Sequence, residues 1–115
     1  PYGRAAVAAM TSEGVYEAVE SKLVLGENVA QAAQFVDSGN ADVGVIALSL
    51  AVAPELRDRG QYARVDLDAY PRLEQGAVVL AASRHPALAG AFLDHVLGPT
   101  GRQVLDRYGF LLPQP

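Results

Sequence analysis

The chain has 115 residues, enough for one domain with its own core, and 50% of them are apolar and 19% charged, as in soluble globular proteins. The net charge of −4, with nine scattered basic residues, argues against nucleic-acid binding, which uses a clustered basic face. The absence of cysteine excludes disulfides, thiolate metal sites and cysteine nucleophiles, and it leaves the redox compartment undecided.

The N-terminal segment predicts two helices followed by a short strand. Residues 3–12 favour a helix through their alanine content, and residues 2–3 are expected to form its entry turn. Gly14 interrupts this pattern, and a second short helix is expected to begin at Val15. Residues 22–25, which are apolar after Lys22, are predicted to form a short strand that leads into the next helix.

The stretch from Gly26 to Ala47 is the most informative part of the chain. Asn28 is a good N-cap, because its short side chain accepts a hydrogen bond from a free amide of the first turn. Gly39 lies where a left-handed residue ends a helix. The amides after such a cap point outward and the helix dipole adds positive charge, so this helix end is predicted to bind an anion. A capped helix that binds nothing is the simpler alternative. Apolar residues recur at helical spacing at Val29, Ala32, Ala33 and Val36.

A β-branched, apolar run follows at residues 42–48 and is typical of a strand buried on both faces. Together with residues 22–25 and the helix between them, it predicts a right-handed βαβ unit. Residues 54–60 are expected to form a short exposed helix or a turn. Residues 62–67 alternate in the manner of a partly exposed strand.

The C-terminal part predicts one more strand and two helices. Residues 68–75 form a connector, and residues 76–83 are expected to form a buried strand. Pro86 suits the first turn of a helix that ends at Gly98, and Pro99 begins the last helix, with Gly109 at its end. The longest apolar runs have the length of buried strands and not of membrane spans. The order of elements predicts an α/β fold.

Other groups of reactive side chains have simple structural explanations. His85 and His95 are interpreted as surface histidines, because no carboxylate triad accompanies them for metal binding or base catalysis. Glu13, Glu17 and Glu20 recur at helical spacing, which indicates a solvated helix face. No serine lies in a nucleophile elbow, and no glycine motif of a phosphate loop occurs. The sequence therefore predicts no enzyme.

Four segments in order along almost the whole chain carry a resemblance: PYGRAAVAAM, LGENVAQAAQFVDSGNADVGVIALS, YPRLEQGAVVLAAS and GPTGRQVLDRYGF. They resemble the molybdate-binding proteins of bacterial ABC importers, which are type II periplasmic binding proteins. The resemblance implies two α/β lobes that clamp an oxyanion, each with a mixed, mainly parallel sheet flanked by helices. Because the sequence starts at Pro1 without an initiator methionine, we expect a fragment that lacks the N-terminal lobe and its serine or threonine ligands.

The resemblance also implies a division of the chain into three parts. Residues 1–68 correspond to the second ligand-binding lobe, and residues 69–75 to a crossing connector. Residues 76–115 correspond to a return strand and C-terminal helices that pack on the first lobe in the family. Without that lobe, exposed strand edges and apolar faces are expected to favour self-association of the fragment as a dimer.

A short set of site residues follows from the same resemblance. Val29 matches the residue whose main-chain amide binds the anion, and Asn28 caps that helix. Tyr2 matches a position where family members use backbone or tyrosine contacts. Some members add a tyrosine hydroxyl at the position of Ala47, so this donor is absent here. The implied ligand is molybdate or tungstate, whose metal is held only through its oxygens, and no cofactor is implied.

The function implied by the resemblance is capture of the oxyanion in the periplasm and delivery to the membrane subunits of an ABC importer. Half of the site is expected to bind molybdate with a dissociation constant on the order of 1 mM or weaker. The alternative is an effector-sensing domain of a transcription regulator, which shares the two-lobed fold. A helix-turn-helix upstream would favour that alternative, and a signal peptide would favour transport.

Overall fold

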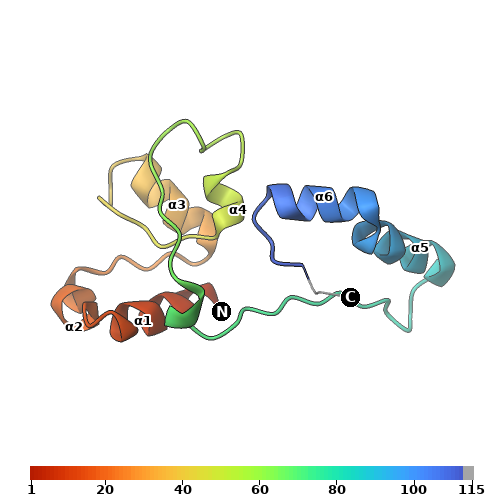
Figure 1. Cartoon of the computed structure of the whole chain (residues 1–115), viewed down its shortest axis with the longest axis horizontal. Helices are drawn as coiled ribbons and strands as arrows, with labels where there is room; N and C mark the ends of the chain where they lie inside the picture. The colour runs from red at the N-terminus through yellow and green to blue at the C-terminus, as the bar shows by residue number, and fades with distance from the viewer. Residues whose placement is uncertain (113–115) are drawn as a thin grey trace. The chain divides into compact units, whose positions relative to one another are not determined.

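A computed structural model describes residues 1–112 of the chain and shows helices joined by irregular segments (Figure 1). No β-strand occurs within these residues. The chain divides into two compact units, the first spanning Pro1–Leu73 and the second beginning at Glu74. The helical elements, in chain order, are α1 (Tyr2–Ser12), α2 (Tyr16–Val19), the 3₁₀ turn η1 (Glu20–Lys22), α3 (Val29–Asp37), α4 (Leu48–Ala51), the 3₁₀ turn η2 (Leu67–Ala69), α5 (Pro86–Leu97) and α6 (Pro99–Arg107).

The predicted α/β fold, with its mainly parallel sheet and its βαβ unit, is therefore wrong. A strand is held in place by a ladder of hydrogen bonds to a neighbouring strand, and the backbone bonds of the described chain form turns and helix ends instead. An apolar, β-branched run indicates side chains that favour burial, whereas the rest of the fold decides whether a pairing partner exists. No ladder forms, within the part described, at any segment expected to be a strand: 22–25, 42–48, 62–67 and 76–83.

Helix α1 begins one residue earlier than the sequence predicts. Tyr2 is its first residue and Pro1 its N-cap, and the Pro1 carbonyl accepts a hydrogen bond of 3.0 Å from the Ala5 N–H. Helix α1 packs against α2 and against η2 within the first unit. Ala5 and Ala9 of α1 and Ala69 of η2 are buried. Their small side chains allow the backbones of these elements to approach closely.

The second predicted helix is confirmed, but it is split. Gly14 ends α1 with a φ of +70°, a left-handed conformation that glycine adopts without steric cost. Helix α2 then continues directly into η1. The Tyr16 hydroxyl donates a hydrogen bond of 3.1 Å to the Glu20 carboxylate, which joins the two elements. This bond raises the pKa of Tyr16, because the neutral phenol is the hydrogen-bond donor.

Helix α3 ends as predicted, and the chain then turns back across it. Gly39 has a φ of +75°, and the Ala41 N–H donates to the Phe35 carbonyl over 2.9 Å. Farther on, a Cβ added to Gly44 would lie only 2.6 Å from Cγ2 of Val36. Residues 42–47 therefore pass close to α3, as an irregular segment that lies against a helix and not as a sheet strand.

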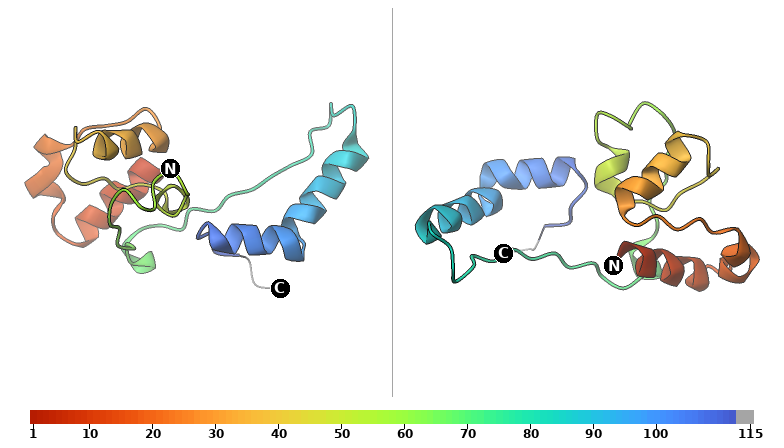
Figure 2. Two further views of the ribbon diagram at one scale, coloured as in Figure 1. Left: turned by 90° about the horizontal axis from the view of Figure 1, so that it is seen from above. Right: turned by 180° about the vertical axis from the view of Figure 1, so that it is seen from behind.

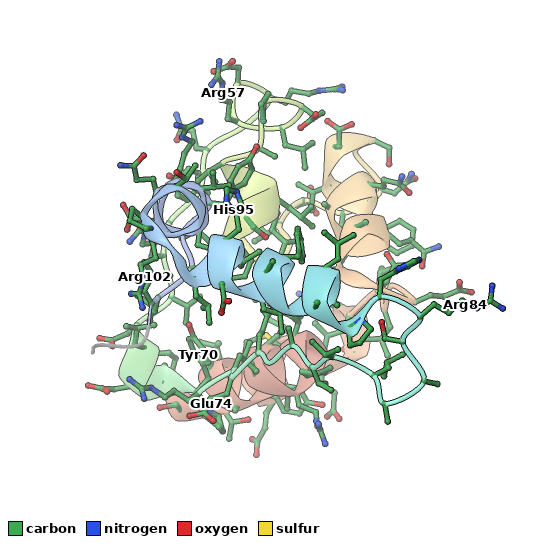
Figure 3. All side chains as sticks on the ribbon, turned by 90° about the vertical axis from the view of Figure 1, so that its right-hand side faces the viewer. Arg57, Tyr70, Glu74, Arg84, His95 and Arg102 are labelled. Atoms are coloured by element: carbon green, nitrogen blue, oxygen red, sulfur yellow. The ribbon has the colours of Figure 1, made fainter. Side chains whose placement is uncertain are left out.

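The segment after α4 consists of turns, in agreement with one of the two forms expected for residues 54–60. The Arg57 N–H donates to the Ala53 carbonyl over 2.9 Å, and the Arg57 side chain points away from the protein (Figure 3). Arg59 forms an ion pair of 2.8 Å with Asp37, the last residue of α3. This pair connects the turns to the C-terminal end of α3. The short helix α4 itself was not expected from the sequence.

The two helices of the second unit match the predicted ones closely. Pro86 and Pro99 each occupy the first turn of their helix, where a missing N–H costs nothing. Gly98 is both the C-cap of α5 and the N-cap of α6. A Cβ added to Gly101 would overlap the Val96 carbonyl oxygen, so the two helices meet at a tight corner. They pack against each other along this corner.

Small side chains make up the buried apolar part of the described chain. No large side chain among residues 1–112 is fully buried, whereas Leu88 and Phe92 of α5 are 71% and 63% exposed. No helix in this range combines the length and the apolar character that a bilayer crossing requires. The buried apolar residues are Ala5, Ala9, Ala33, Ala47 and Ala69.

Candidate functional site

The N-terminal end of α3 is built as the sequence predicts around Asn28. This residue has an extended backbone, with φ of −154° and ψ of 170°, and is the N-cap of the helix. Its Oδ1 accepts a hydrogen bond of 2.9 Å from the Gln31 N–H, which otherwise has no partner in the first turn. The Asn28 carbonyl accepts the first helical bond, from the Ala32 N–H. The capping role of Asn28 is therefore confirmed.

A second hydrogen bond at this end was missed by the sequence reasoning. The Gln31 Oε1 accepts a bond of 2.7 Å from the N–H of Glu27, the residue before the cap. Gln31 thus accepts through its side chain and donates through its backbone, as in a capping box, except that the reciprocal bond comes from the residue before the cap and not from the cap itself. The signal was present, because Asn followed three residues later by Gln is the sequence form of such a box.

The bonds to Glu27 and Gln31 determine which amides of the first turn remain available. Among residues 1–112, no acceptor contacts the N–H groups of Asn28, Val29 or Ala30. These are consecutive donors at the positive end of the helix dipole, an arrangement that suits an anion. The predicted donor, Val29, is half-buried and its N–H is free. Ala30 adds a donor that the sequence analysis did not name.

The loop before α3 is held close to the helix by Gly26. A Cβ added there would lie 2.9 Å from the Ala32 nitrogen and 3.0 Å from the Asn28 carbonyl oxygen. Real Cβ atoms essentially never show the first of these distances, and the second is tighter than most real contacts, so a larger residue would displace the loop. Gly26 therefore lets the chain fold against the first turn and fixes the backbone that presents the open amides.

Tyr2, the third predicted site residue, lies on a different helix of the same unit. In the views of Figures 1 and 2, the chain terminus from which α1 starts lies beside the N-terminal turn of α3. Tyr2 is half-buried in the first turn of α1 and already takes part in an interaction within the chain. Tyr2 and the Asn28–Val29 turn thus belong to the same unit, although α1 and α3 are not among the helices of residues 1–112 that pack closely on each other.

Ala47 is the position at which the resemblance implies a tyrosine hydroxyl in some relatives. The residue is buried, with 7% of its surface exposed, and is the N-cap of α4 without a side-chain hydrogen bond. A methyl group provides no donor to an oxyanion.

The histidines and the other carboxylates do not form a second centre. His85 is the N-cap of α5 and His95 lies in its last turn, and both are exposed. Figure 3 shows His95 and Arg84 at opposite ends of α5. Within residues 1–112, no three histidine, aspartate or glutamate side chains gather in a way that holds a metal ion. The first turn of α3 thus remains the candidate site.

Comparison with known proteins identifies relatives along almost the whole chain. The family model described as bacterial extracellular solute-binding protein matches residues 1–111. The chain is 38% identical over 111 residues to the molybdate-binding protein ModA of Rhodobacter capsulatus, covering 96% of this chain and 43% of that protein. It is 39% identical over 110 residues to ModA of Azotobacter vinelandii, covering 96% and 44%. The chain therefore spans less than half the length of these relatives. No solved structure matches the chain.

Proposed function

This chain belongs to the family of bacterial extracellular solute-binding proteins, and we propose that it supplies part of the site through which such a protein captures molybdate. The observation that carries this proposal is the row of open amides at Asn28, Val29 and Ala30. The names of the two relatives, both molybdate-binding proteins, support the choice of oxyanion. Capture is non-covalent, and no reaction is catalysed.

The chemistry of the ligand suits a site made of uncharged donors. A tetrahedral dianion such as molybdate offers oxygen acceptors and carries no proton at neutral pH, so fixed N–H and O–H groups match it. Sulfate has shorter bonds, and donors spaced for the larger ion would leave some of its hydrogen bonds unmade. Tungstate is nearly the same size as molybdate, so we propose that the site accepts both.

Each predicted site residue has a distinct part in this proposal. Val29 donates its main-chain N–H to the oxyanion, and Ala30 adds a second amide from the same turn. Asn28 holds the turn open by capping it through Oδ1. Tyr2, in the first turn of α1, contacts the oxyanion through its backbone or its hydroxyl group in this proposal.

The number of donors sets the affinity expected of this chain. Hydrogen bonds to a charged group contribute roughly 1.5–3 kcal/mol each. Two or three of them give about 4–8 kcal/mol, from which ordering and association costs of several kcal/mol are subtracted. The expected dissociation constant for molybdate is on the order of 1 mM or weaker. A longer protein with further donors would bind more tightly.

The setting of this function is also part of the proposal. We propose that residues 1–68 hold the ligand and that residues 69–75 connect them to the C-terminal part. Residues 76–115 then pack against a lobe that corresponds to the part of the longer relatives outside the matched region. The whole protein would act in the periplasm and deliver the oxyanion to the membrane subunits of an ABC importer. Membership in an extracellular family supports this location.

Self-association of the isolated chain is a separate proposal. Apolar side chains of the second unit are widely exposed, among them Val78 (75%), Leu80 (71%) and Leu88 (71%). Exposed apolar surface of this kind favours association between copies. Light scattering is expected to give the mass of a dimer, and a monomer at high concentration would contradict the proposal.

A proline substitution at Val29 tests the site directly. V29P removes one N–H at the first helical position, where proline is tolerated, and the extended backbone of Asn28 is compatible with a following proline. V29A keeps the N–H and is the matched control. In an NMR titration with sodium molybdate, V29P is expected to bind about 10- to 100-fold more weakly than V29A, the loss of one charge-assisted hydrogen bond.

Two results would contradict the proposal. Equal affinity of V29P and V29A would show that the Val29 amide does not contact the anion. A response to sulfate as strong as the response to molybdate would show that the site does not select the larger oxyanion. Circular dichroism of both variants checks that α3 is intact.

A further inference from the structure

Gln31 occupies a central position at the head of α3, because it makes two hydrogen bonds there. Its N–H donates to Asn28 Oδ1 over 2.9 Å, and its Oε1 accepts from the Glu27 N–H over 2.7 Å. Resting on the proposed function, we propose that Gln31 is a positioning residue for the oxyanion. It fixes the turn that presents the open amides, and it does so without adding a negative charge beside them.

The positioning role follows from the two N–H groups that the hydrogen bonds of Gln31 occupy. With the N–H groups of Glu27 and Gln31 both occupied, the amides of Asn28, Val29 and Ala30 remain as one uninterrupted row among the described residues. The two bonds span the turn from the residue before the cap to the third helical residue. They therefore restrain the backbone on both sides of this row.

The loop on the far side of the cap strengthens this restraint. Gly26 lies so close to the first turn that an added Cβ would meet the Ala32 nitrogen at 2.9 Å. The Glu27–Gln31 bond thus closes a loop that is already packed against the helix. Donors that are fixed before binding lose little freedom when the ligand arrives, so a fixed row binds more tightly than a mobile one.

The neutral charge of the Gln31 side chain also matters for the affinity of the site. Capping boxes use glutamate as readily as glutamine at this position, and glutamate also interacts favourably with the helix dipole. A carboxylate at position 31 would keep the bond to the Glu27 N–H but would place a negative charge within about one helical turn of a bound dianion. The Glu27 carboxylate itself is on an exposed side chain. Neutral Gln31 therefore caps the helix and preserves its positive potential for the ligand.

The variant Gln31→Glu separates this role from a structural one. Helix content and melting temperature are expected to stay the same or rise, while molybdate affinity falls about five- to tenfold at low salt, as Coulomb repulsion at roughly 7 Å in water gives. The deficit is expected to shrink as salt screens the charge. Gln34→Glu adds the same charge farther along α3 and is the matched control, with a smaller expected effect. All chains are titrated with sodium molybdate by NMR, following the amides of residues 28–30.

The outcomes distinguish this inference from the proposed function. If the natural chain binds molybdate and Q31E binds it equally at low salt, the inference is overturned and the proposed function stands. If the natural chain shows no response at any molybdate concentration, both fail. Amide hydrogen exchange gives a test without ligand: the Glu27 N–H is expected to exchange more slowly than the Val29 N–H, and faster in Q31A. Exchange of Glu27 as fast as that of Val29 would remove the bond on which the inference depends.

Discussion

Replacing Asn28 with alanine removes the acceptor that satisfies the Gln31 N–H over 2.9 Å at the start of α3. Loss of an N-cap side chain costs about 1 kcal/mol, within a range of roughly 0.5–2 kcal/mol. Helix α3 belongs to a unit that spans Pro1–Leu73. For a domain of that size, about 1 kcal/mol lowers the melting temperature by about 4–8 °C.

Thermal unfolding followed by far-UV circular dichroism measures this effect. Asn28→Ser is the matched control, because serine caps a helix about as well as asparagine and is expected to melt near the natural chain. The alanine variant is also expected to lose molybdate affinity, since the turn that presents the amides is less well fixed. A melting temperature for N28A equal to that of N28S would refute the capping argument.

Other substitutions have defined expected outcomes. Gly101→Ala places a Cβ onto the Val96 carbonyl oxygen and is expected to destabilise the α5–α6 corner by about 1–3 kcal/mol. Urea unfolding measures this loss. An unchanged unfolding midpoint would argue against a tight corner. Gly39→Ala forces an L-residue to a φ of +75° and is expected to cost about 1–2 kcal/mol, while Gly39→Asn costs less in the same assay. The pKa of Tyr16 is raised by its hydrogen bond to Glu20, so Glu20→Gln is expected to lower it toward the ordinary value of 10.0 in an ultraviolet titration; no change would contradict the bond.

The ends of the helices could be predicted because the signals are local. Asn28 caps α3 through a side chain only three residues from its donor, and Pro86 requires nothing beyond its own ring geometry. Gly39 and Gly109 take left-handed backbone angles of +75° and +79° at predicted helix ends. Each of these residues acts within one helical turn, so the sequence contains the relevant information.

The strands could not be predicted correctly because a strand depends on distant partners. Val78 and Leu80 belong to an apolar run with the composition of a buried strand, yet both are exposed in this structure. Their composition indicates a preference for burial and gives no information on whether a second backbone lies alongside. Local patterns were therefore reliable for helices and misleading for sheets.

The candidate site shows the same contrast between local and distant information. The free N–H of Val29 follows from the cap beside it, and the Asn28–Gln31 box has a recognisable sequence form that was overlooked. The position of Tyr2 relative to α3 could not be predicted locally, since 26 intervening residues separate Tyr2 from Val29. The role of Tyr2 was implied only by resemblance and remains a proposal.

The alanine composition of the buried positions inverts the usual pattern of mutational sensitivity. At Ala5, Ala9 and Ala69 there is almost no side chain to truncate, so shortening cannot open a void there. Enlargement to valine or leucine would instead push α1 away from its neighbours, because α1 packs against η2 and these alanines are already buried. Selection on this chain would consequently act against added volume, and natural variation at these sites would be confined to glycine, alanine and serine.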